Sequence, residues 1–276
     1  SAELYGEDLK TVGEFVVDAG QSVPFVLSYG RSFESPPGPI DPVEALERTE
    51  AFWREWSDRC PGVGPWTEAV KRSLITLKAL TYAPTGAIVA AATTSLPERP
   101  GGTRNWDYRY CWLRDATFTL LAFLHLGYYE EASAWGEWLH RAVAGSPRQV
   151  QIVYGIGGER RLPELIIPWL SGYENSSPVR VGNAASEQLQ IDIFGEIADA
   201  IFQGFKLGMQ PSKRGEALQP VIIEYLKTVW RQPDEGIWEI RGDPRHFVHS
   251  KVMAWVAFDR AAAYVQARGG PELARR

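Results

Sequence analysis

Residues 104–115 read Arg-Asn-Trp-Asp-Tyr-Arg-Tyr-Cys-Trp-Leu-Arg-Asp and stand directly before an apolar helical segment. A core segment rarely carries so many charges, and a solvated loop rarely carries two Trp and two Tyr. Aromatic rings stack on the apolar C–H faces of sugars, while carboxylates and guanidinium groups bind hydroxyls in fixed directions. The stretch therefore predicts a sugar-binding site, and the alternative is a buried polar knot that ties two helices together.

The bulk properties of the chain narrow its class. It has 276 residues, a net charge of −5, 45% hydrophobic and 23% charged residues, which suits a globular chain of one large domain or of a domain with part of another. No basic stripe favours nucleic acid or an anionic membrane, and no apolar run approaches the roughly 18–20 residues that span a bilayer. The start of the chain lacks a signal-peptide pattern, and its two cysteines, Cys60 and Cys111, predict neither a disulfide framework nor a metal knuckle. We therefore expect a cytoplasmic protein without a cofactor or metal.

The first sixty residues predict strands and then a helix. Residues 13–30 read as two strands around an Asp-Ala-Gly-Gln turn. Because a lone hairpin is marginally stable in water, these strands are expected to belong to a larger sheet. The proline-rich segment 31–42 predicts a domain boundary. Asp41 and Pro42 then predict the N-cap and first turn of a helix through Cys60.

The rest of the chain shows helical spacing of its apolar residues. Helices are predicted at 64–82, 112–127, 128–144, 184–208, 213–232 and 248–268. Two long irregular segments, 83–111 and 145–183, interrupt them, and segments of that length usually build a site. This alternation predicts paired helices arranged around a centre, with function collected at one end.

The candidate proton donor is Glu239, which stands between Trp238 and Ile240 in a predicted loop. A carboxyl held against aromatic and aliphatic surface loses hydration, which raises its pKa and lets it donate a proton near neutral pH. Arg241 and Arg245 act in the opposite sense, because nearby cations favour the carboxylate. The alternative is a turn that carries an incidental acid.

Two other groups of polar residues carry weaker signals. Asp192, Glu196 and Asp199 fall on one face of a predicted helix, a pattern typical of a solvated or salt-bridged stripe, and Glu196 is the second candidate acid. His246 and His249 stand three residues apart, which indicates the start of a helix more than a metal site in a chain with four His.

Four motifs resemble glycoside hydrolase family 15. They are Leu74–Glu98, the stretch 104–115, Pro178–Asp192 and Gly236–Asp259. The resemblance covers about residues 10–268 and points to the bacterial and archaeal branch, which holds glucoamylases, glucodextranases and trehalases.

The resemblance implies a mainly α fold in three parts. Residues 1–40 would end an N-terminal β-sandwich, residues 41–62 would form a linker helix, and residues 63–276 would form the first six helices of an (α/α)6 toroid. The family's toroid has twelve helices, so the remaining helices or a second chain would complete it. Counting helices from residue 64 places Glu239 after the fifth, where the family carries its general acid.

The activity that the resemblance implies is inverting hydrolysis of α-glucosidic bonds with release of glucose, in the manner of a glucoamylase. Glu239 would be the general acid, and the Arg114–Asp115 pair would bind hydroxyls of the innermost glucosyl unit. The other substrate-binding residues implied are Trp106, Asp107, Trp112, Arg180, Asn183, Gln188, Trp238 and Lys251.

No residue matches the family's general base, which follows a later helix. Inversion needs a second carboxylate about 6.5–9.5 Å from the acid to activate water. We therefore expect this chain by itself to lack hydrolase activity. Two alternatives stay open: an α,α-trehalase, which shares the glucosyl pocket and differs on the acceptor side, and a non-catalytic carbohydrate-binding or structural fragment. The expected partner is an α-glucoside, with no nucleic acid and no membrane.

Overall fold

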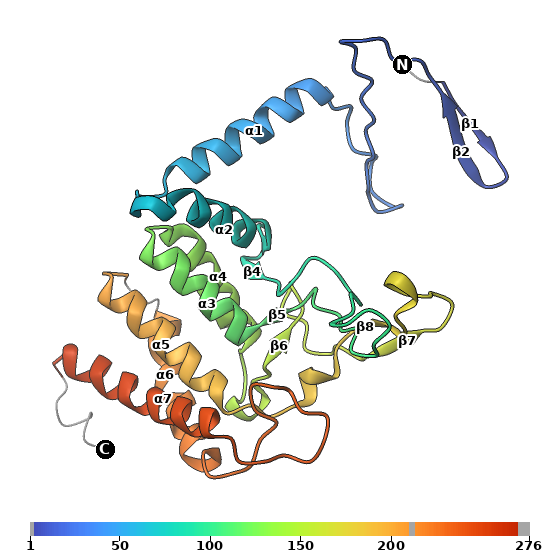
Figure 1. Cartoon of the computed structure of the whole chain (residues 1–276). Coiled ribbons are helices and arrows are strands. Elements are labelled where there is room, and N and C mark those ends of the chain that lie inside the picture. Colours follow the sequence, from blue (N-terminus) through green and yellow to red (C-terminus); the bar gives the residue numbers. More distant parts are fainter. Residues whose placement is uncertain (1–2, 210–212, 270–276) are drawn as a thin grey trace. The chain divides into compact units, whose positions relative to one another are not determined.

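The computed structural model describes residues 3–209 and 213–269, without the side chains of residues 213–216 (Figure 1). The parts of the predicted domains at residues 1–2, 210–212 and 270–276 lie outside the described residues. The chain divides into two compact units, Ser1–Arg59 and Cys60–Arg276. No helix among the described residues combines the length and the apolar character that crossing a membrane requires.

The strands of the first unit differ from the predicted ones. β1 (Glu3–Glu7) pairs antiparallel with β2 (Lys10–Glu14), so the hairpin lies upstream of the predicted strands at 13–30. The predicted turn does form, since the Gln21 amide donates to the Asp18 carbonyl.

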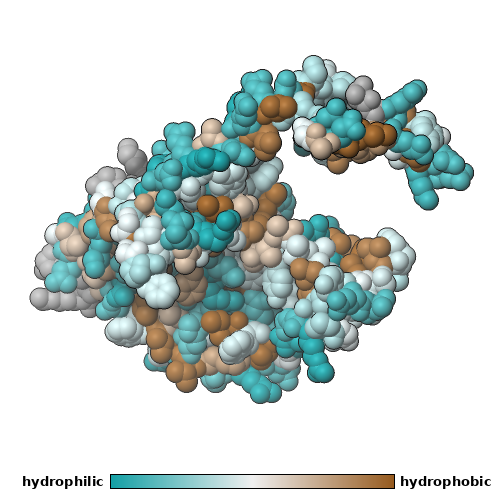
Figure 2. Space-filling model, turned by 45° about the horizontal axis from the view of Figure 1, so that its top comes forward, coloured by the Kyte–Doolittle hydropathy of each residue, from teal (hydrophilic) through white to brown (hydrophobic). Residues whose placement is uncertain are grey.

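The predicted strands themselves are wrong, because no strand among the described residues pairs with them beyond Glu14. Strand propensity largely expresses packing against neighbouring strands. Val16 and Leu27 are exposed, and brown hydrophobic surface is visible on this unit in Figure 2. The rings of Phe15 and Phe25 still meet across the turn, with centroids 5.2 Å apart, but no ladder forms between their segments.

The predicted helix of the first unit is confirmed as α1 (Pro42–Asp58). The side chain of Asp41 caps it, with Oδ1 accepting from the amides of Val43 at 2.9 Å and Glu44 at 3.1 Å. Pro42 occupies the first turn, where its missing N–H costs no hydrogen bond.

The second unit is mostly helical, as predicted. Its helices are α2 (Thr67–Ala79), α3 (Leu113–His125), α4 (Tyr129–Ala142), α5 (Asp192–Lys206), α6 (Lys213–Val229) and α7 (Val248–Ala267). Each predicted helix is present. α5 begins eight residues later than predicted, because Ala184–Glu187 forms a separate 3₁₀ helix capped by Asn183 and the chain is extended at Gln188.

Six short strands pair in the long segments between these helices. β3 (Thr81–Tyr82) pairs with β4 (Ala87–Ile88), β5 (Cys111–Trp112) with β6 (Val153–Tyr154), and β7 (Leu165–Ile167) with β8 (Val179–Val181). β5 leads directly into α3, and Figure 1 shows β6 beside β5 near that end of the helix, with β8 and β7 farther out to the right. The long segments are therefore ordered around the N-terminal end of α3.

α3, α5 and α7 pack side by side, and α5 approaches α7 most closely at a glycine. A Cβ on Gly195 of α5 would overlap the carbonyl oxygen of Met253 on α7. The core beside them is large and aromatic, with Phe123, Trp138 and Phe194 almost fully buried.

We expect Gly195→Ala to lower the free energy of unfolding by about 1–3 kcal/mol, because α5 and α7 must move apart. Replacing a glycine inside a helix with alanine usually raises stability by about 1 kcal/mol, so a loss here would have the opposite sign. Gly136→Ala on α4 is the matched control, because a Cβ there meets nothing within 4 Å. Thermal melts should show a fall in Tm for the first variant only, and equal shifts would contradict the packing argument.

Candidate active site

A cleft of about 950 Å³ opens at the N-terminal end of α3. Its lining residues are Ala90, Glu98, Arg104, Trp106, Tyr108, Trp112, Arg114, Asp115, Ile237, Trp238, Glu239, Ile240 and Arg241. They come from the stretch 104–115 with its preceding segment and from the loop between α6 and α7. The structure thus brings together six of the predicted site residues: Trp106, Trp112, Arg114, Asp115, Trp238 and Glu239.

Glu239 faces into the corner formed by Trp112 and Arg114. Trp112 Nε1 donates to Glu239 Oε1 at 2.7 Å, and Arg114 Nη2 donates to the same oxygen at 3.4 Å. Its side chain is 23% exposed. Burial raises the pKa of Glu239, although Arg114 and hydrogen bonds from Trp112 and Gln190 act in the opposite sense. Trp112 and Arg114 therefore both contact Oε1 of this carboxyl.

The backbone at Glu239 adopts a left-handed conformation, with φ of 50°. Its amide donates to the carbonyl of Gly236 at 3.0 Å, which closes a tight turn. Non-glycine residues adopt this conformation only where the surroundings impose it. The loop therefore fixes the carboxyl toward the cleft through its backbone as well as through its side chain.

Arg114 connects the acid to α5. Its Nη1 donates to Gln190 Oε1 at 2.8 Å and to Asp192 Oδ2 at 2.9 Å, while the residue is 9% exposed. Asp115, in contrast, is exposed in the cleft. Desolvation of its carboxyl raises the pKa of Asp115, and Arg114 acts to lower it. Arg114 and Asp115 therefore have different surroundings: the Arg114 guanidinium contacts Glu239, and the Asp115 carboxylate faces the cleft.

Asp107 and Asn183 were predicted in the sugar site, and the structure places both away from the cleft. The buried Asp107 carboxylate accepts from Arg109 Nε at 2.9 Å and Nη2 at 2.8 Å, and from the Gly182 amide at 3.1 Å. Asn183 accepts from the Ala185 amide and donates to the Asp107 carbonyl. Side chains alternate along an extended segment, so Asp107 points opposite to its neighbours that line the cleft. These two residues fasten the segment before α3 to the segment after β8.

Gln188 and Lys251 also hold backbone instead of lining the cleft. Gln188 Nε2 donates to the Ile240 carbonyl at 3.1 Å, directly behind the acid. Lys251 Nζ donates to the Trp230 carbonyl at 2.8 Å, just past the C-terminal end of α6. A cation there binds the carbonyls that the helix leaves unpaired. Sequence position alone could not distinguish these anchors from residues that face a ligand.

Tyr108 and Arg241 line the cleft and were not predicted as site residues. The ring of Tyr108 packs on Trp112, with centroids 5.6 Å apart. Alternation with Trp106 in the same stretch is a signal that could have identified it. Arg241 had been considered only as a charge near the acid. Arg180, a predicted site residue, is not among the lining residues and lies over the ring of Trp106 instead.

The stripe on α5, predicted as solvated or salt-bridged, is not solvated at Asp192 and Glu196, which are buried. Asp192 is salt-bridged to Arg114, and Asp199 forms a part-exposed ion pair with Arg260. His249 Nε2 lies 3.7 Å from Asp192 Oδ2 and 3.8 Å from Glu196 Oε1. Ligand atoms of these three residues lie within 4.8 Å of one another, which is the spacing of a possible metal site. Arg114 already compensates Asp192, however, and a metal ion would lie beside that guanidinium.

The burial of Glu196 predicts a pH effect on stability. Desolvation and the nearby Asp192 raise its pKa to about 7 from an ordinary value of 4.5. A raised pKa means that the folded chain binds this proton more tightly than the unfolded chain does. Protonated Glu196 therefore contributes fully to the free energy of unfolding below pH 4.5, and this contribution is lost as the pH rises through about 7. Glu196→Gln does not titrate. It should therefore gain about 1–3 kcal/mol relative to the wild type between pH 5 and pH 8 in urea unfolding. A difference that does not change with pH would contradict the assignment.

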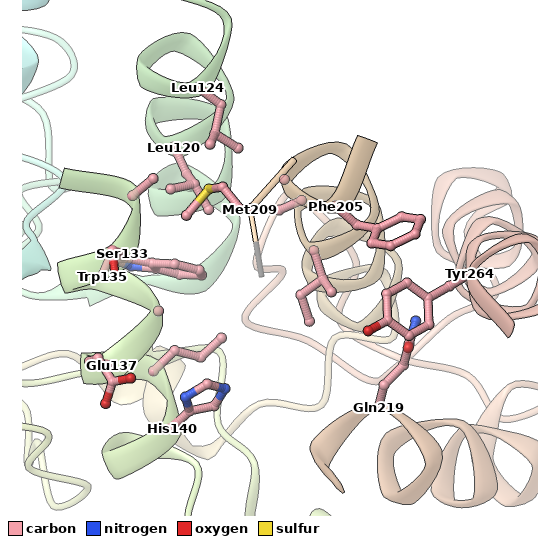
Figure 3. Close-up of a pocket in the computed structure, with 16 residues that line it drawn as sticks. Leu120, Leu124, Ser133, Trp135, Glu137, His140, Phe205, Met209, Gln219 and Tyr264 are labelled. Atoms are coloured by element: carbon pink, nitrogen blue, oxygen red, sulfur yellow. The ribbon is translucent and has the colours of Figure 1, made fainter. Parts of the chain in front are cut away.

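A second cavity, of about 210 Å³, shares no lining residue with the cleft (Figure 3). It lies among α3, α4, α5 and α7, and its walls include Leu120, Leu124, Trp135 and Phe205. These walls are mainly apolar, and the predicted sugar-site residues are not among them. The cleft is therefore the candidate active site.

Comparisons with known proteins identify the family of the chain. The sequence model of glycosyl hydrolases family 15 matches residues 64–276. The trehalase of Mycolicibacterium smegmatis is 42% identical over 270 residues, which is 93% of this chain and 39% of that protein. The trehalase of Mycobacterium tuberculosis is 41% identical over 266 residues, 93% of this chain and 38% of that protein. The chain thus spans about two-fifths of the length of the curated relatives it matches.

The fold also has a counterpart among solved structures. The structure of a glycosidase variant superposes with a TM-score of 0.53 at 18% identity, covering 76% of this chain and 54% of that chain. At that identity the likeness supports a shared fold alone. The family model and the trehalases confirm the resemblance stated from the motifs, and the chain belongs to glycoside hydrolase family 15.

Proposed function

We propose that this chain supplies the proton-donating half of an active site that hydrolyses the α-glucosidic bond of α,α-trehalose. The observation that carries the proposal is Glu239, a carboxyl with a raised pKa that accepts hydrogen bonds from Trp112 and Arg114 at the wall of a cleft. The cleft volume of about 950 Å³ falls within the usual range for small-ligand sites, about 300–1,000 Å³.

The proposed substrate differs from the glucoamylase-type substrate that the sequence analysis favoured. The relatives with 41–42% identity are named trehalase, so an α,α-linked disaccharide takes precedence over an α-1,4-glucan. Both substrates present a glucosyl unit to the Arg114–Asp115 corner, and they differ in the sugar beyond the scissile bond.

In the proposed reaction, protonated Glu239 donates its proton to the glycosidic oxygen as the bond from that oxygen to the anomeric carbon breaks. The first glucose leaves with that proton. As that bond breaks, a water molecule attacks the anomeric carbon from the opposite face, and a carboxylate about 6.5–9.5 Å from the acid accepts its proton. We assign this base to the part of the family's catalytic domain that this chain does not span, because no residue of the sequence matches the family's base.

The exposed face of α7 supports a half-toroid that further helices complete. Val248, Val252 and Trp255 follow helical spacing, and all three are exposed. An apolar stripe of this kind normally packs against a neighbouring helix. We propose that the next helices of an (α/α)6 ring cover it.

A chimaera tests the proposed function. Residues 64–269 would replace the matching segment of the Mycolicibacterium smegmatis trehalase, and glucose release from trehalose and from maltose would be measured. The chimaera should cleave trehalose and prefer it to maltose. Faster cleavage of maltose would overturn the substrate assignment, and a folded chimaera that cleaves neither would overturn the proposed activity.

A further inference from the structure

Trp106, which lines the cleft, has two cationic neighbours, Arg180 and Arg241. The guanidinium carbon of Arg180 lies 4.6 Å from the centroid of its ring, and that of Arg241 lies 4.5 Å from it. Guanidinium groups at this distance attract the negative face of an indole, most strongly where water is partly excluded. The ring of Trp106 is therefore already engaged by protein groups, which limits its use as a stacking surface for sugar.

One carboxylate serves both arginines. Glu164 Oε1 lies 3.2 Å from Arg180 Nε, and Oε2 lies 3.2 Å from Arg241 Nη2. Oε2 also accepts from the Ala184 amide at 3.1 Å. We call Glu164, Arg180, Arg241 and Trp106 the Glu164 clamp. It joins three segments that lie far apart in the sequence: the one before α3, the one around β7 and β8, and the loop between α6 and α7.

The clamp lies where the acid-bearing loop leaves the site. At its entry the loop is held by Glu235, whose Oε2 accepts from the Leu189 amide at 2.9 Å. Beyond Glu239, the Ile240 carbonyl accepts from Gln188 Nε2, and the Arg241 side chain is held by the clamp. Two peptide units separate Arg241 from Glu239, so their α-carbons can lie at most about 7 Å apart, and a displaced Arg241 carries the acid with it.

We propose that Glu164 is a positioning residue for Glu239. It holds Arg241 beside Trp106 and Arg180, and the loop transmits this constraint to the carboxyl. The assignment rests on the proposed function, in which Glu239 is the acid. Without the Glu164 charge, two guanidinium groups would face one ring with no shared counter-ion, and their repulsion would release the end of the loop. A misplacement of about 1 Å can reduce a rate by roughly a hundredfold.

Hydrogen exchange on the chain itself tests the constraint without needing activity. Glu164→Gln should speed exchange at the amides of Glu239 and Ile240 by roughly tenfold, because local opening becomes easier. Exchange in α3 and α5 should stay within about twofold. The control is Glu159→Gln, an acid in the same long segment that accepts from the neighbouring Gly157 amide. If the amides of Glu239 and Ile240 exchanged in Glu164→Gln at the same rate as in the wild type, the proposal would be overturned.

Kinetics in the chimaera separate positioning from general damage. Hydrolysis of trehalose requires a proton for its leaving group, whereas α-glucosyl fluoride releases fluoride without one. Glu164→Gln should lower kcat for trehalose at least roughly tenfold, with KM and the glucosyl fluoride rate within about twofold. Equal losses on both substrates would assign Glu164 to folding or binding, and no loss on either would also overturn the proposal.

A shorter acid provides a second variant should Glu164→Gln fail to fold. Glu164→Asp keeps the charge near both arginines, so it should recover part of the exchange protection and part of the trehalose rate. If the exchange protection and the trehalose rate of Glu164→Asp were no higher than those of Glu164→Gln, the result would contradict a role for the charge. If the chimaera proves inactive on both sugars, the exchange measurements still decide whether the clamp holds the loop, so failure of the proposed function and failure of this inference are distinguishable.

Discussion

Glu239→Gln is expected to lower the hydrolysis of trehalose in the chimaera by roughly 10²–10⁴-fold, the usual contribution of a general acid. The amide keeps the shape of the side chain and can still accept from Trp112 and Arg114, but it has no proton to give to the leaving oxygen. The affinity for trehalose should change by less than about threefold, because the variant loses an interaction made only in the transition state. Initial rates and isothermal titration measure the two effects.

The rate on α-glucosyl fluoride is the control for this variant, since fluoride leaves without protonation. It should remain close to that of the unsubstituted chimaera. The pH profile adds a second check: activity requires the protonated carboxyl, so it should fall as the pH rises through the raised pKa of Glu239, and this limb should vanish in the glutamine variant. A trehalose rate reduced by less than about tenfold would mean that another group donates the proton.

Asp192→Ala is expected to lower the free energy of unfolding of the chain by about 3–5 kcal/mol. Arg114 is 9% exposed and Asp192 is fully buried, so the substitution removes the nearer acid partner of a buried guanidinium and leaves only Glu239 Oε1, 3.4 Å from Nη2. Gln190 still accepts one hydrogen bond from Arg114 but carries no charge. Urea unfolding at constant pH measures the loss.

Asp199→Ala is the matched control on the same helix. Its ion pair with Arg260 is part-exposed, with side chains 23% and 29% exposed, so its loss should cost about 1 kcal/mol or less. A further arm adds Arg114→Met to Asp192→Ala, which removes the uncompensated charge and should restore much of the stability. Equal losses for Asp192→Ala and Asp199→Ala would show that the buried pair carries no special weight.

Helical periodicity predicted the helices of the second unit well, because the spacing of apolar residues that marks the buried face of a helix can be read from that helix's own sequence. α3 and α4 each place apolar residues at helical spacing, and their predicted ends differ from the observed ones by at most a few residues. The hairpin at 13–30 failed because the burial of a strand depends on neighbours that its own sequence does not contain. The late start of α5 has a local cause, since Asn183 caps a separate 3₁₀ helix in place of the predicted helix.

The cleft was predictable in part from the stretch 104–115. Alternation along it could have separated Trp106 and Tyr108, which line the cleft, from Asp107, which does not. The anchors behind the site were not predictable in this way. Lys251 and Asp192 stand in the first turn of their helices. Only the packing of α7 against α6 decides that Lys251 binds a carbonyl, and only the packing of α5 against α3 decides that Asp192 pairs with a buried guanidinium.

The hydrogen bond from Trp112 to Glu239 joins residues 127 positions apart in the chain. Contacts of such long range form slowly, because the entropy of closing the loop is lost before the contact can compensate for it. The helices can therefore form before the carboxyl of Glu239 meets the Trp112 indole, and an emerging polypeptide that stops short of the loop after α6 lacks Glu239, the proposed proton donor. If Glu239 acts as proposed, the proton-donating site is thus completed late in folding, when distant segments of the chain come together.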